Sequence, residues 1–219
     1  MARALAELTA AELAIFRRQL NTPPKIQRFL DDIRYNTEVG GETFRSPRRV
    51  LADRTANCIE GAVLAAAALR VQGDPPLIMD LTAVRDEDHV IAVFRKGSLW
   101  GAIGTSKFTG LRYREPVYRT LRELAMSYFE QYFNLAGERT LRGHGRPVNL
   151  ARFDAMRWMT SAKDLWPIAE HLERIPHISL VAPAAARRLT PLGPRLRAAG
   201  LLDHPTAGPQ RRDVDERTS

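Results

Sequence analysis

The run Cys58-Ile-Glu-Gly-Ala-Val-Leu-Ala-Ala-Ala-Ala68 begins with the only cysteine of the 219-residue chain. Small apolar residues around most of its circumference predict a helix packed closely on several sides, at the centre of the fold. A thiol at a helix start meets unpaired backbone N–H groups and the positive end of the helix dipole, which both favour the nucleophilic thiolate. The pattern is also typical of a buried structural thiol, because free cysteine is common in protein cores.

Amphipathic helices are predicted before this run. Thr9 and Glu12 have the spacing of a capping box, so we expect a first helix from 10 to 20. After Pro23-Pro24, apolar residues at helical spacing predict a second helix over 26–35, followed by an irregular connection that leads to Cys58.

Strand patterns follow the Cys58 helix. Three strands are predicted, at 76–84, 89–94 and 98–103. If Lys96-Gly97 is a two-residue hairpin turn, His89 faces Gly104 across the hairpin and shares one face of the sheet with Ile91 and Val93. A polar imidazole at the open end of an apolar face needs a partner, and the Cys58 thiol is a suitable one.

The C-terminal half reads mainly as helix and loop. The sequence predicts a long helix from Pro116 to Gly137, a loop over 139–149, a helix capped by Ser161 and Asp164, and a short helix over 192–202. We divide the chain into an N-terminal helical segment (1–25), a main domain with C-terminal helices (26–182) and a Pro/Arg-rich tail (183–219), largely disordered after 204. The expected fold class is α+β, with helices on a short antiparallel sheet.

Cys58 and His89 together have the pairing logic of an activated nucleophile. The imidazole would take the thiol proton, and the thiolate would attack an acyl carbon. We therefore expect the thiol pKa to lie below the ordinary value of about 8.5. The backbone N–H of Cys58, with Asn57 as a neighbouring donor, is expected to stabilise the oxyanion.

The arrangement resembles the transglutaminase-like superfamily of papain-type cysteine enzymes, in the form of a bacterial transglutaminase-like domain. The likeness extends over about residues 26–106, and the segments that carry it are Ile33-Arg34-Tyr35, Ala56-Asn57-Cys58, the helix exit at Gly73, and a hairpin that begins at His89 and contains Trp100. The resemblance implies a papain-like fold, with Cys58 as the nucleophile and His89 as the base.

The chain departs from the family at Gly104. Family members usually place an Asp four residues after the hairpin Trp, where it orients the imidazole, and Gly104 has no side chain. Three explanations stay open: a Cys–His dyad with a backbone carbonyl or water holding the ring, substitution by Ser106, or a degenerate site in a binding scaffold. Orienting groups are worth orders of magnitude in rate.

Other polar residues are weaker candidates. Arg112, Tyr113 and Arg114 follow the hairpin and could line the site, where two arginines beside an aromatic ring would hold a substrate carboxylate or phosphate; a solvated surface run is the alternative. His144 lies in a predicted loop that could cover the site. His171 and His177 have no acidic partner at ligand spacing, so no metal site is expected, and no organic cofactor is implied.

Composition narrows the setting. No stretch has the length and apolarity of a membrane span, and the N-terminal residues contain no uninterrupted apolar segment of a secretory signal. A single cysteine fits a reducing compartment, so we expect a cytoplasmic protein. The net charge of +8 allows a nucleic-acid partner, but the basic residues are spread along helix faces, which disfavours that interpretation.

The sequence thus predicts cysteine-dependent acyl transfer on an amide or peptide substrate: hydrolysis as a peptidase or amidase, deamidation, or transamidation of the transglutaminase type. These reactions differ in whether water or an amine resolves the acyl-enzyme. The alternative is a catalytically degenerate scaffold that engages a protein or nucleic acid through its basic surface.

Overall fold

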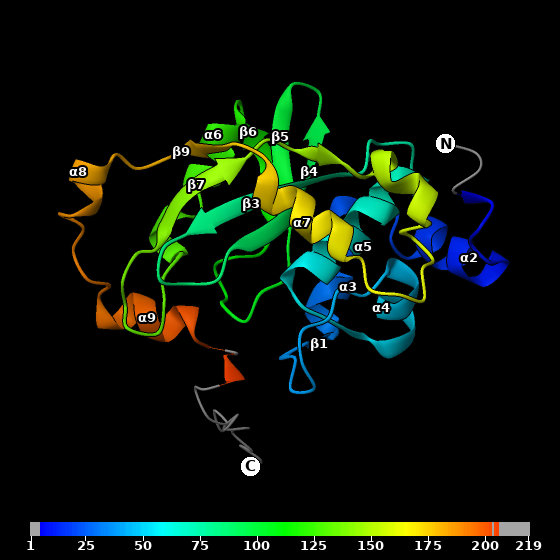
Figure 1. Cartoon of the computed structure of the whole chain (residues 1–219), viewed down its shortest axis with the longest axis horizontal. Helices are drawn as coiled ribbons and strands as arrows, with labels where there is room; N and C mark the ends of the chain where they lie inside the picture. The colour runs from blue at the N-terminus through cyan, green and yellow to red at the C-terminus, as the bar shows by residue number, and fades with distance from the viewer. Residues whose placement is uncertain (1–4, 203, 206–219) are drawn as a thin grey trace, which may run out of the picture.

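The computed structural model describes residues 5–202, 204 and 205, and it places helices on an antiparallel sheet (Figure 1). The expected α+β class is confirmed at this level. Helices α2 to α5 gather beside one half of the sheet, whereas α8 and α9 lie beyond its other end (Figure 1). No helix in the described ranges is both long and apolar enough to cross a membrane.

The N-terminal helices pack on the centre of the fold. Helix α2 (Ala10–Arg18) has the predicted capping box between Thr9 and Glu12. Helix α3 (Pro23–Asp32) begins at the proline pair itself, because proline is well suited to the first helical turn. Phe16 and Leu20 are fully buried in the same cluster as the core residues of α5. The segment 1–25 therefore shares the core of the main domain over its described part.

The connection before Cys58 is more regular than expected. It contains helix α4 (Pro47–Asp53), capped by Ser46, and a two-stranded parallel pair of β1 (Arg34–Tyr35) and β2 (Thr55–Ala56). The pair joins the end of the second predicted helix to the entry of α5, so Tyr35 is extended rather than helical.

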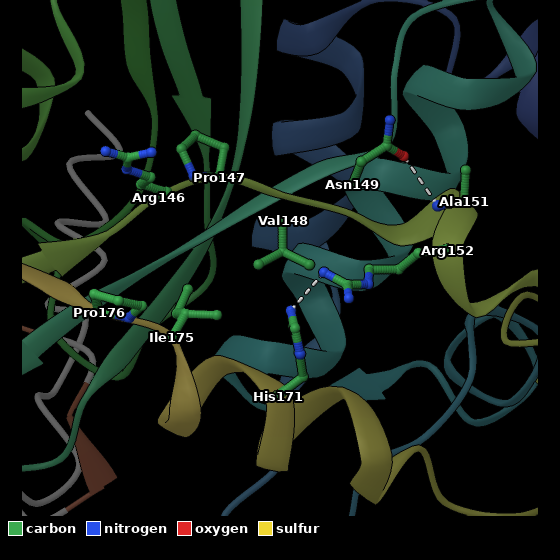
Figure 2. A pocket seen from close by; sticks show the side chains of 9 residues that line it. All are labelled: Arg146, Pro147, Val148, Asn149, Ala151, Arg152, His171, Ile175 and Pro176. Carbon is green, nitrogen blue, oxygen red and sulfur yellow. Dashed lines mark hydrogen bonds between the residues drawn. The ribbon is translucent and has the colours of Figure 1, made fainter.

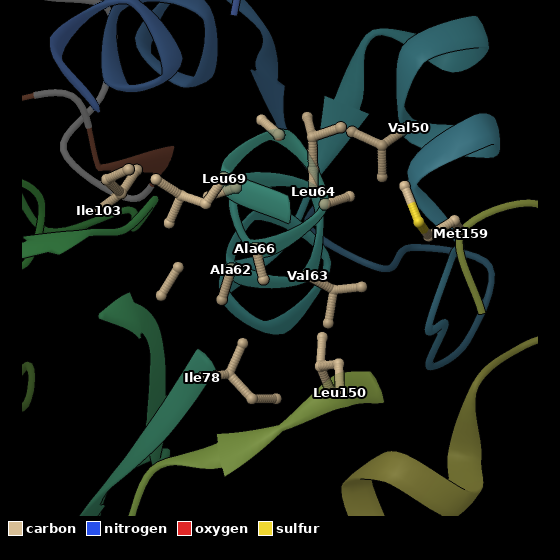
Figure 3. Close-up of a cluster of buried hydrophobic side chains, with 14 of the residues drawn as sticks. Val50, Ala62, Val63, Leu64, Ala66, Leu69, Ile78, Ile103, Leu150 and Met159 are labelled. Carbon is tan, nitrogen blue, oxygen red and sulfur yellow. The ribbon is translucent and has the colours of Figure 1, made fainter. Parts of the chain in front are cut away.

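Helix α5 (Cys58–Val71) is surrounded on all sides, as the small-residue pattern predicted. Residues 60–70 are all buried. Figure 3 looks close to the helix axis and shows side chains from α4, the sheet and the loops around it. Its alanines permit this close approach from several directions. Gly61 packs closely on Thr105, because a Cβ at this position would lie 2.4 Å from Cγ2 of Thr105.

The main sheet has the order β6-β5-β4-β3-β7-β9, with β8 paired to the start of β3. All its pairings are antiparallel. Its strands are β3 (Leu77–Ala83), β4 (His89–Lys96), β5 (Leu99–Ile103), β6 (Arg114–Tyr118), β7 (Leu141–Gly145), β8 (Val148–Asn149) and β9 (His177–Ser179). The three strands predicted after α5 are confirmed as β3, β4 and β5, within a sheet that is larger than expected.

The predicted hairpin register is wrong by two residues. Lys96 pairs with Leu99, so the turn consists of Gly97 and Ser98, and Phe94 faces Gly101. Gly97 has a φ of 62°, which glycine adopts without strain. The alternation of faces is unaffected, because a shift of two residues preserves the side of the sheet to which each residue points.

The helix predicted from Pro116 is wrong. Residues 114–118 form β6, in which half-buried and exposed positions alternate, and only the short helix α6 (Leu121–Met126) and the 3-10 turn η1 (Phe129–Gln131) follow. Proline is tolerated in β6 because this strand lies at an edge of the sheet. The apolar residues from Val117 onward have helical spacing, but they extend from the end of a strand into a short helix.

The loop predicted over 139–149 is also wrong, since it contains β7 and β8. Gly143 made this segment resemble a loop, but it serves close packing within the sheet. A Cβ at Gly143 would lie 2.7 Å from Oγ1 of Thr82 and 3.1 Å from the carbonyl oxygen of Ile178. Glycine in a strand often marks such an approach.

The last helices follow the sequence in outline. After the 3-10 segment η2 (Leu150–Met156), helix α7 (Trp166–Arg174) forms with Ile168 and Leu172 buried, but the predicted Ser161–Asp164 cap is wrong. Asp164 instead accepts hydrogen bonds from the Phe44 N–H and from Arg49. Helices α8 (Pro183–Ala186) and α9 (Pro194–Gly200) follow. The disorder predicted after 204 falls almost wholly outside the described residues.

Candidate active site

Cys58 is the first residue of α5 and is partly exposed. Asn57 caps the helix and forms a reciprocal capping box with Glu60, whose carboxylate also accepts hydrogen bonds from Thr43 and the Arg45 N–H. This buried network fixes the backbone at the point where the thiol leaves the helix. The thiol thus stands at the start of a helix, as the sequence predicted, on a backbone held by this network.

His89 opens β4 and is 4% exposed. Its Nε2 lies 2.8 Å from the carbonyl oxygen of Leu111, and a carbonyl can only accept, so Nε2 carries the proton and Nδ1 has a free lone pair. The rings of Tyr128 and Tyr132 contact the imidazole edge-to-face. Burial lowers the pKa of His89 to about 4, so the imidazole is neutral at pH 7.

Cys58 and His89 line one small cavity of about 20 Å³, enough for a single water molecule. The cavity also contacts Tyr35, Asp86, Glu87, Asp88, Ser106, Lys107, Phe108, Leu111 and Tyr132. Over the described part of the chain no hydrogen bond joins the thiol to the imidazole ring. The fold thus places Cys58 and His89 on one small cavity, without a hydrogen bond between their side chains.

The thiol is not pre-ionised. Burial raises the pKa of Cys58 to about 11, and the nearby carboxylates of Glu87 and Asp80 act in the same direction. The backbone N–H groups of Val90 and Ile59 oppose this rise but do not outweigh it. The expected lowering of the pKa is therefore wrong for this state of the protein, because the cost of desolvating a thiolate exceeds the helix-terminus effect.

Gly104 lies beside the His89 ring although the predicted pairing was incorrect. A Cβ built on Gly104 would be 3.4 Å from Nε2 of His89 and 3.4 Å from the Leu111 carbonyl oxygen. An Asp side chain at position 104 would thus point to Nε2 of His89, the nitrogen that is hydrogen-bonded to the Leu111 carbonyl. Of the three explanations for the missing Asp, the backbone carbonyl is the one for which a contact is present.

Ser106 lines the small cavity but holds other partners. Its Oγ accepts a hydrogen bond from the Phe108 N–H at 3.0 Å, and its carbonyl accepts one from Arg112 at 2.8 Å. These bonds shape the loop beside the cavity. No hydrogen bond from Ser106 to His89 is present in the described chain, so the orienting role considered for Ser106 has no contact behind it.

Asn57 is engaged away from the thiol. Its Nδ2 donates to Glu38 and to the Thr43 carbonyl, and its Oδ1 accepts from the Glu60 N–H. Tyr35 is better placed as a polar neighbour of the nucleophile, because it lines the small cavity together with Cys58. Burial holds the pKa of Tyr35 far above its usual range, which keeps the phenol protonated. The sequence indicates Tyr35 only as part of the segment Ile33-Arg34-Tyr35 that supports the family resemblance, and not as a site residue.

The remaining candidates lie outside the small cavity. Trp100 stacks under Arg95 at the turn end of the hairpin. Arg112 pairs with Asp31 at 2.7 Å, Tyr113 stacks on Phe94, and Arg114 covers the Tyr128 ring. These contacts assign Arg112, Tyr113 and Arg114 to the packing around the His89 strand.

A larger cleft of about 360 Å³ opens on the other side of Cys58. Its carboxylates are those of Glu38, Glu42, Asp80, Glu87, Asp88 and Glu173, and Trp166 of α7 forms part of its wall. Within the described part of the chain, none of its lining residues is Lys or Arg. Cys58, Glu87 and Asp88 line both this cleft and the small cavity, so the thiol stands where the two meet.

A separate groove of about 610 Å³ lies on the opposite flank of α7, between that helix and the segment that contains β8 (Figure 2). Arg152 donates to Nε2 of His171 at 2.8 Å there, and Arg146 lies at the other end of the view (Figure 2). The groove contains none of the predicted site residues.

The other histidines have structural partners. His144, predicted in a loop, is buried in β7 and bonds the Gly145 carbonyl. His177 does have an acidic partner, since its Nε2 lies 2.9 Å from Oδ2 of Asp80. The pair joins residues remote in sequence, which spacing alone could not show. Within the described residues no group of three His, Cys, Asp or Glu side chains is arranged to hold a metal ion.

Comparison with known proteins adds no assignment. The chain matches no model of a protein family, and it matches none of the curated proteins.

Proposed function

We propose that the chain is a cysteine-dependent acyl-transfer enzyme of the transglutaminase-like, papain-type class. The observation that carries the proposal is the shared chamber of Cys58 and His89, in which Leu111 holds Nε2–H and leaves Nδ1 unprotonated. A rigid helix terminus that presents a thiol beside a neutral imidazole has the parts that nucleophilic catalysis requires.

The resting charges favour general-base activation over a preformed ion pair. With a thiol pKa of about 11 and an imidazole pKa of about 4, both groups are neutral at pH 7. Nδ1 of His89 would take the thiol proton as Sγ attacks the carbonyl carbon of the substrate. The carbonyl oxygen becomes an oxyanion, which the Cys58 N–H and the Tyr35 hydroxyl would stabilise as donors beside the thiol.

Collapse of the tetrahedral intermediate completes acylation. The C–N bond breaks, the leaving amine receives the proton from Nδ1–H, and Cys58 becomes a thioester. Water, deprotonated by the same imidazole, would give hydrolysis or deamidation, and an amine would give transamidation. The Leu111 carbonyl would stabilise the imidazolium through the Nε2–H bond, in place of the usual carboxylate.

Acylation of Cys58 by a generic ester tests the proposal. The protein is mixed with p-nitrophenyl acetate, nitrophenolate release is followed, and the acylated residue is identified by mass spectrometry. We expect a thioester on Cys58, no such adduct in Cys58→Ala, and acylation slower by about 100-fold in His89→Gln. Equal acylation of the wild type and His89→Gln would overturn the dyad and favour the binding-scaffold alternative.

A further inference from the structure

We propose that the cleft beside Cys58 binds a basic peptide segment of the substrate, with a Lys or Arg side chain next to the reacting amide. This inference rests on the proposed function for its reaction, but the binding surface is argued independently. It concerns the residues that select the substrate, which the Cys58–His89 pair does not specify.

The charge of the cleft is the first support. Among the residues that the structure describes, six carboxylates and no Lys or Arg line the cleft, in a protein with a net charge of +8. Lys107, which lines the adjoining small cavity, pairs with Glu87 at 3.0 Å. Glu42 and Glu173 are exposed, and their carboxylates make no hydrogen bond or ion pair with any described residue. Four of the six carboxylates, those of Glu38, Glu42, Asp88 and Glu173, form no ion pair with a described residue, whereas Glu87 and Asp80 have the partners Lys107 and His177. Like charges in a concave surface concentrate cations there.

Asp80 is the second support for a cation-binding cleft, because its side chain is almost wholly buried. Its side chain is 6% exposed, and it lies on the wall of the cleft. His177 bonds Oδ2, while Oδ1 has no hydrogen-bond partner within the described residues. Among the described residues Oδ1 is not one of the enclosed polar atoms that lack a partner, so this oxygen stays accessible on the wall of the cleft. Oδ1 is a ready acceptor for an ammonium or guanidinium group.

Trp166 adds a surface suited to the same chemistry. Its side chain is held edge-to-face by Phe44 and remains 39% exposed. A flat aromatic wall beside carboxylates binds the aliphatic stem and the cationic head of Lys or Arg through apolar and cation–π contact. The carboxylates are distributed along the cleft, and none of the described acids forms a metal-type cluster. The arrangement therefore fits an extended organic cation better than a metal ion.

Binding of a cation would also act on the nucleophile. Glu87 and Asp80 are among the groups that keep the Cys58 thiol protonated. A substrate cation near these carboxylates offsets their field and favours proton transfer from the thiol to His89. The cleft would in this way couple recognition of the basic segment to activation of the thiol.

Charged thiol reagents test the field at Cys58 without any acyl substrate. A trimethylammonium-ethyl methanethiosulfonate and its sulfonate analogue each react with the thiolate to form a mixed disulfide and release methanesulfinate. At low salt, we expect the cationic-to-anionic rate ratio to exceed that of a free-cysteine peptide by about tenfold or more. The excess should shrink at least threefold in Glu42→Gln/Glu173→Gln and on addition of about 0.5 M salt.

Glu170→Gln is the matched control, because Glu170 lies on α7 like Glu173 but does not line the cleft. It should leave the ratio unchanged. A ratio in the wild type equal to that of the free peptide, or an equal loss in the control, would overturn the proposal.

Peptide binding provides a second measurement that does not need a reactive thiol. A fluorescent peptide with Gln between two Arg residues is titrated into Cys58→Ser, beside a version with Glu in place of Arg. We expect the basic peptide to bind at least about tenfold more tightly, and Glu42→Gln/Glu173→Gln to weaken it by about threefold or more. Equal binding of both peptides would overturn the inference. Spermidine serves as a competitor that carries positive charge but no peptide backbone. If it displaces the labelled peptide as effectively as the unlabelled peptide does, the claim that the ligand is a peptide is overturned. Charge selectivity without acylation would refute only the proposed function, and acylation without selectivity only this inference.

Discussion

The Nε2–H of His89 donates to the carbonyl oxygen of Leu111 at 2.8 Å, across the position that Gly104 leaves without a side chain. A backbone carbonyl therefore fixes the tautomer and the plane of the imidazole. A carbonyl carries only a partial charge, so its hydrogen bond raises the pKa of His89 less than a carboxylate would, and burial outweighs it. This hydrogen bond determines which nitrogen of His89 carries the proton and which is free to act as a base.

Replacing Gly104 by Asp should convert the site to its carboxylate form. We expect Gly104→Asp to raise the pKa of His89 by one unit or more above its present value of about 4. Gly104→Ala is the control, because its Cβ meets Ile91 at 3.1 Å and adds no charge. The measurement is a titration of the His89 ring by NMR, and equal pKa values in both variants would contradict the prediction.

The buried imidazole should make stability depend on pH. Unfolded His89 binds a proton near pH 6.5 and the folded residue only near pH 4, so the unfolded state holds more protons between these values. Its contribution is thus fully present above pH 6.5 and is lost as the pH falls toward 4, by up to about 3 kcal/mol.

Denaturant titrations at pH 4.5, 5.5 and 7 of the wild type and His89→Gln isolate this contribution. The raised pKa of Asp80, about 6, acts in the opposite sense in both proteins and cancels in their difference. The difference in unfolding free energy should shrink as the pH falls. A difference independent of pH would show that His89 titrates normally in the folded state.

Alkylation of Cys58 in the free protein should be slow. With a pKa of about 11 against about 8.5 for an unperturbed thiol, its thiolate fraction at pH 8 is roughly 200-fold smaller. We expect the rate with iodoacetamide to keep rising up to about pH 11. Urea-unfolded protein serves as the control for accessibility, and rapid alkylation of the folded protein at pH 6 would contradict the raised pKa.

The contact between Gly61 and Thr105 should make a helix-favouring substitution destabilising. Gly61→Ala ordinarily stabilises a helix by about 1 kcal/mol, but its Cβ would lie 2.4 Å from Cγ2 of Thr105. We expect a net loss of about 1–3 kcal/mol. In the double variant Gly61→Ala/Thr105→Ser the methyl group is absent, so most of the loss should be recovered in denaturant unfolding. No recovery would locate the strain elsewhere.

The buried Arg70 should make the protein sensitive to loss of its partner. Arg70 is 3% exposed and forms two hydrogen bonds with Asp154, which Trp158 also contacts. Asp154→Ala leaves a buried guanidinium unpaired, at a cost of about 3–5 kcal/mol in unfolding free energy. Glu170→Gln removes an exposed pair with Arg174 and should cost less than about 0.5 kcal/mol. Equal melting temperatures of the two variants would contradict this assignment.

The sequence by itself determined the elements whose signals are local. The small-residue run of α5, the capping box at Thr9 and the apolar strands before and after His89 each express a short-range pattern, and each forms as predicted. The sequence also indicated Cys58 and His89 as a pair, and the fold places both on one chamber.

The tertiary structure decided the features that depend on long-range contact. Gly143 made its segment resemble a loop, because the close approach of neighbouring strands cannot be read from the sequence. Pro116 made its segment resemble the start of a helix, because the sequence does not show that this strand lies at the sheet edge, where proline is tolerated. The carbonyl that holds His89 comes from Leu111, and the acids of the cleft converge from segments as distant as Glu38 and Glu173. Desolvation of Cys58, which reverses the expected direction of its pKa shift, depends on all the elements packed around it. Packing and solvation at a site are set by residues that only the folded chain brings together.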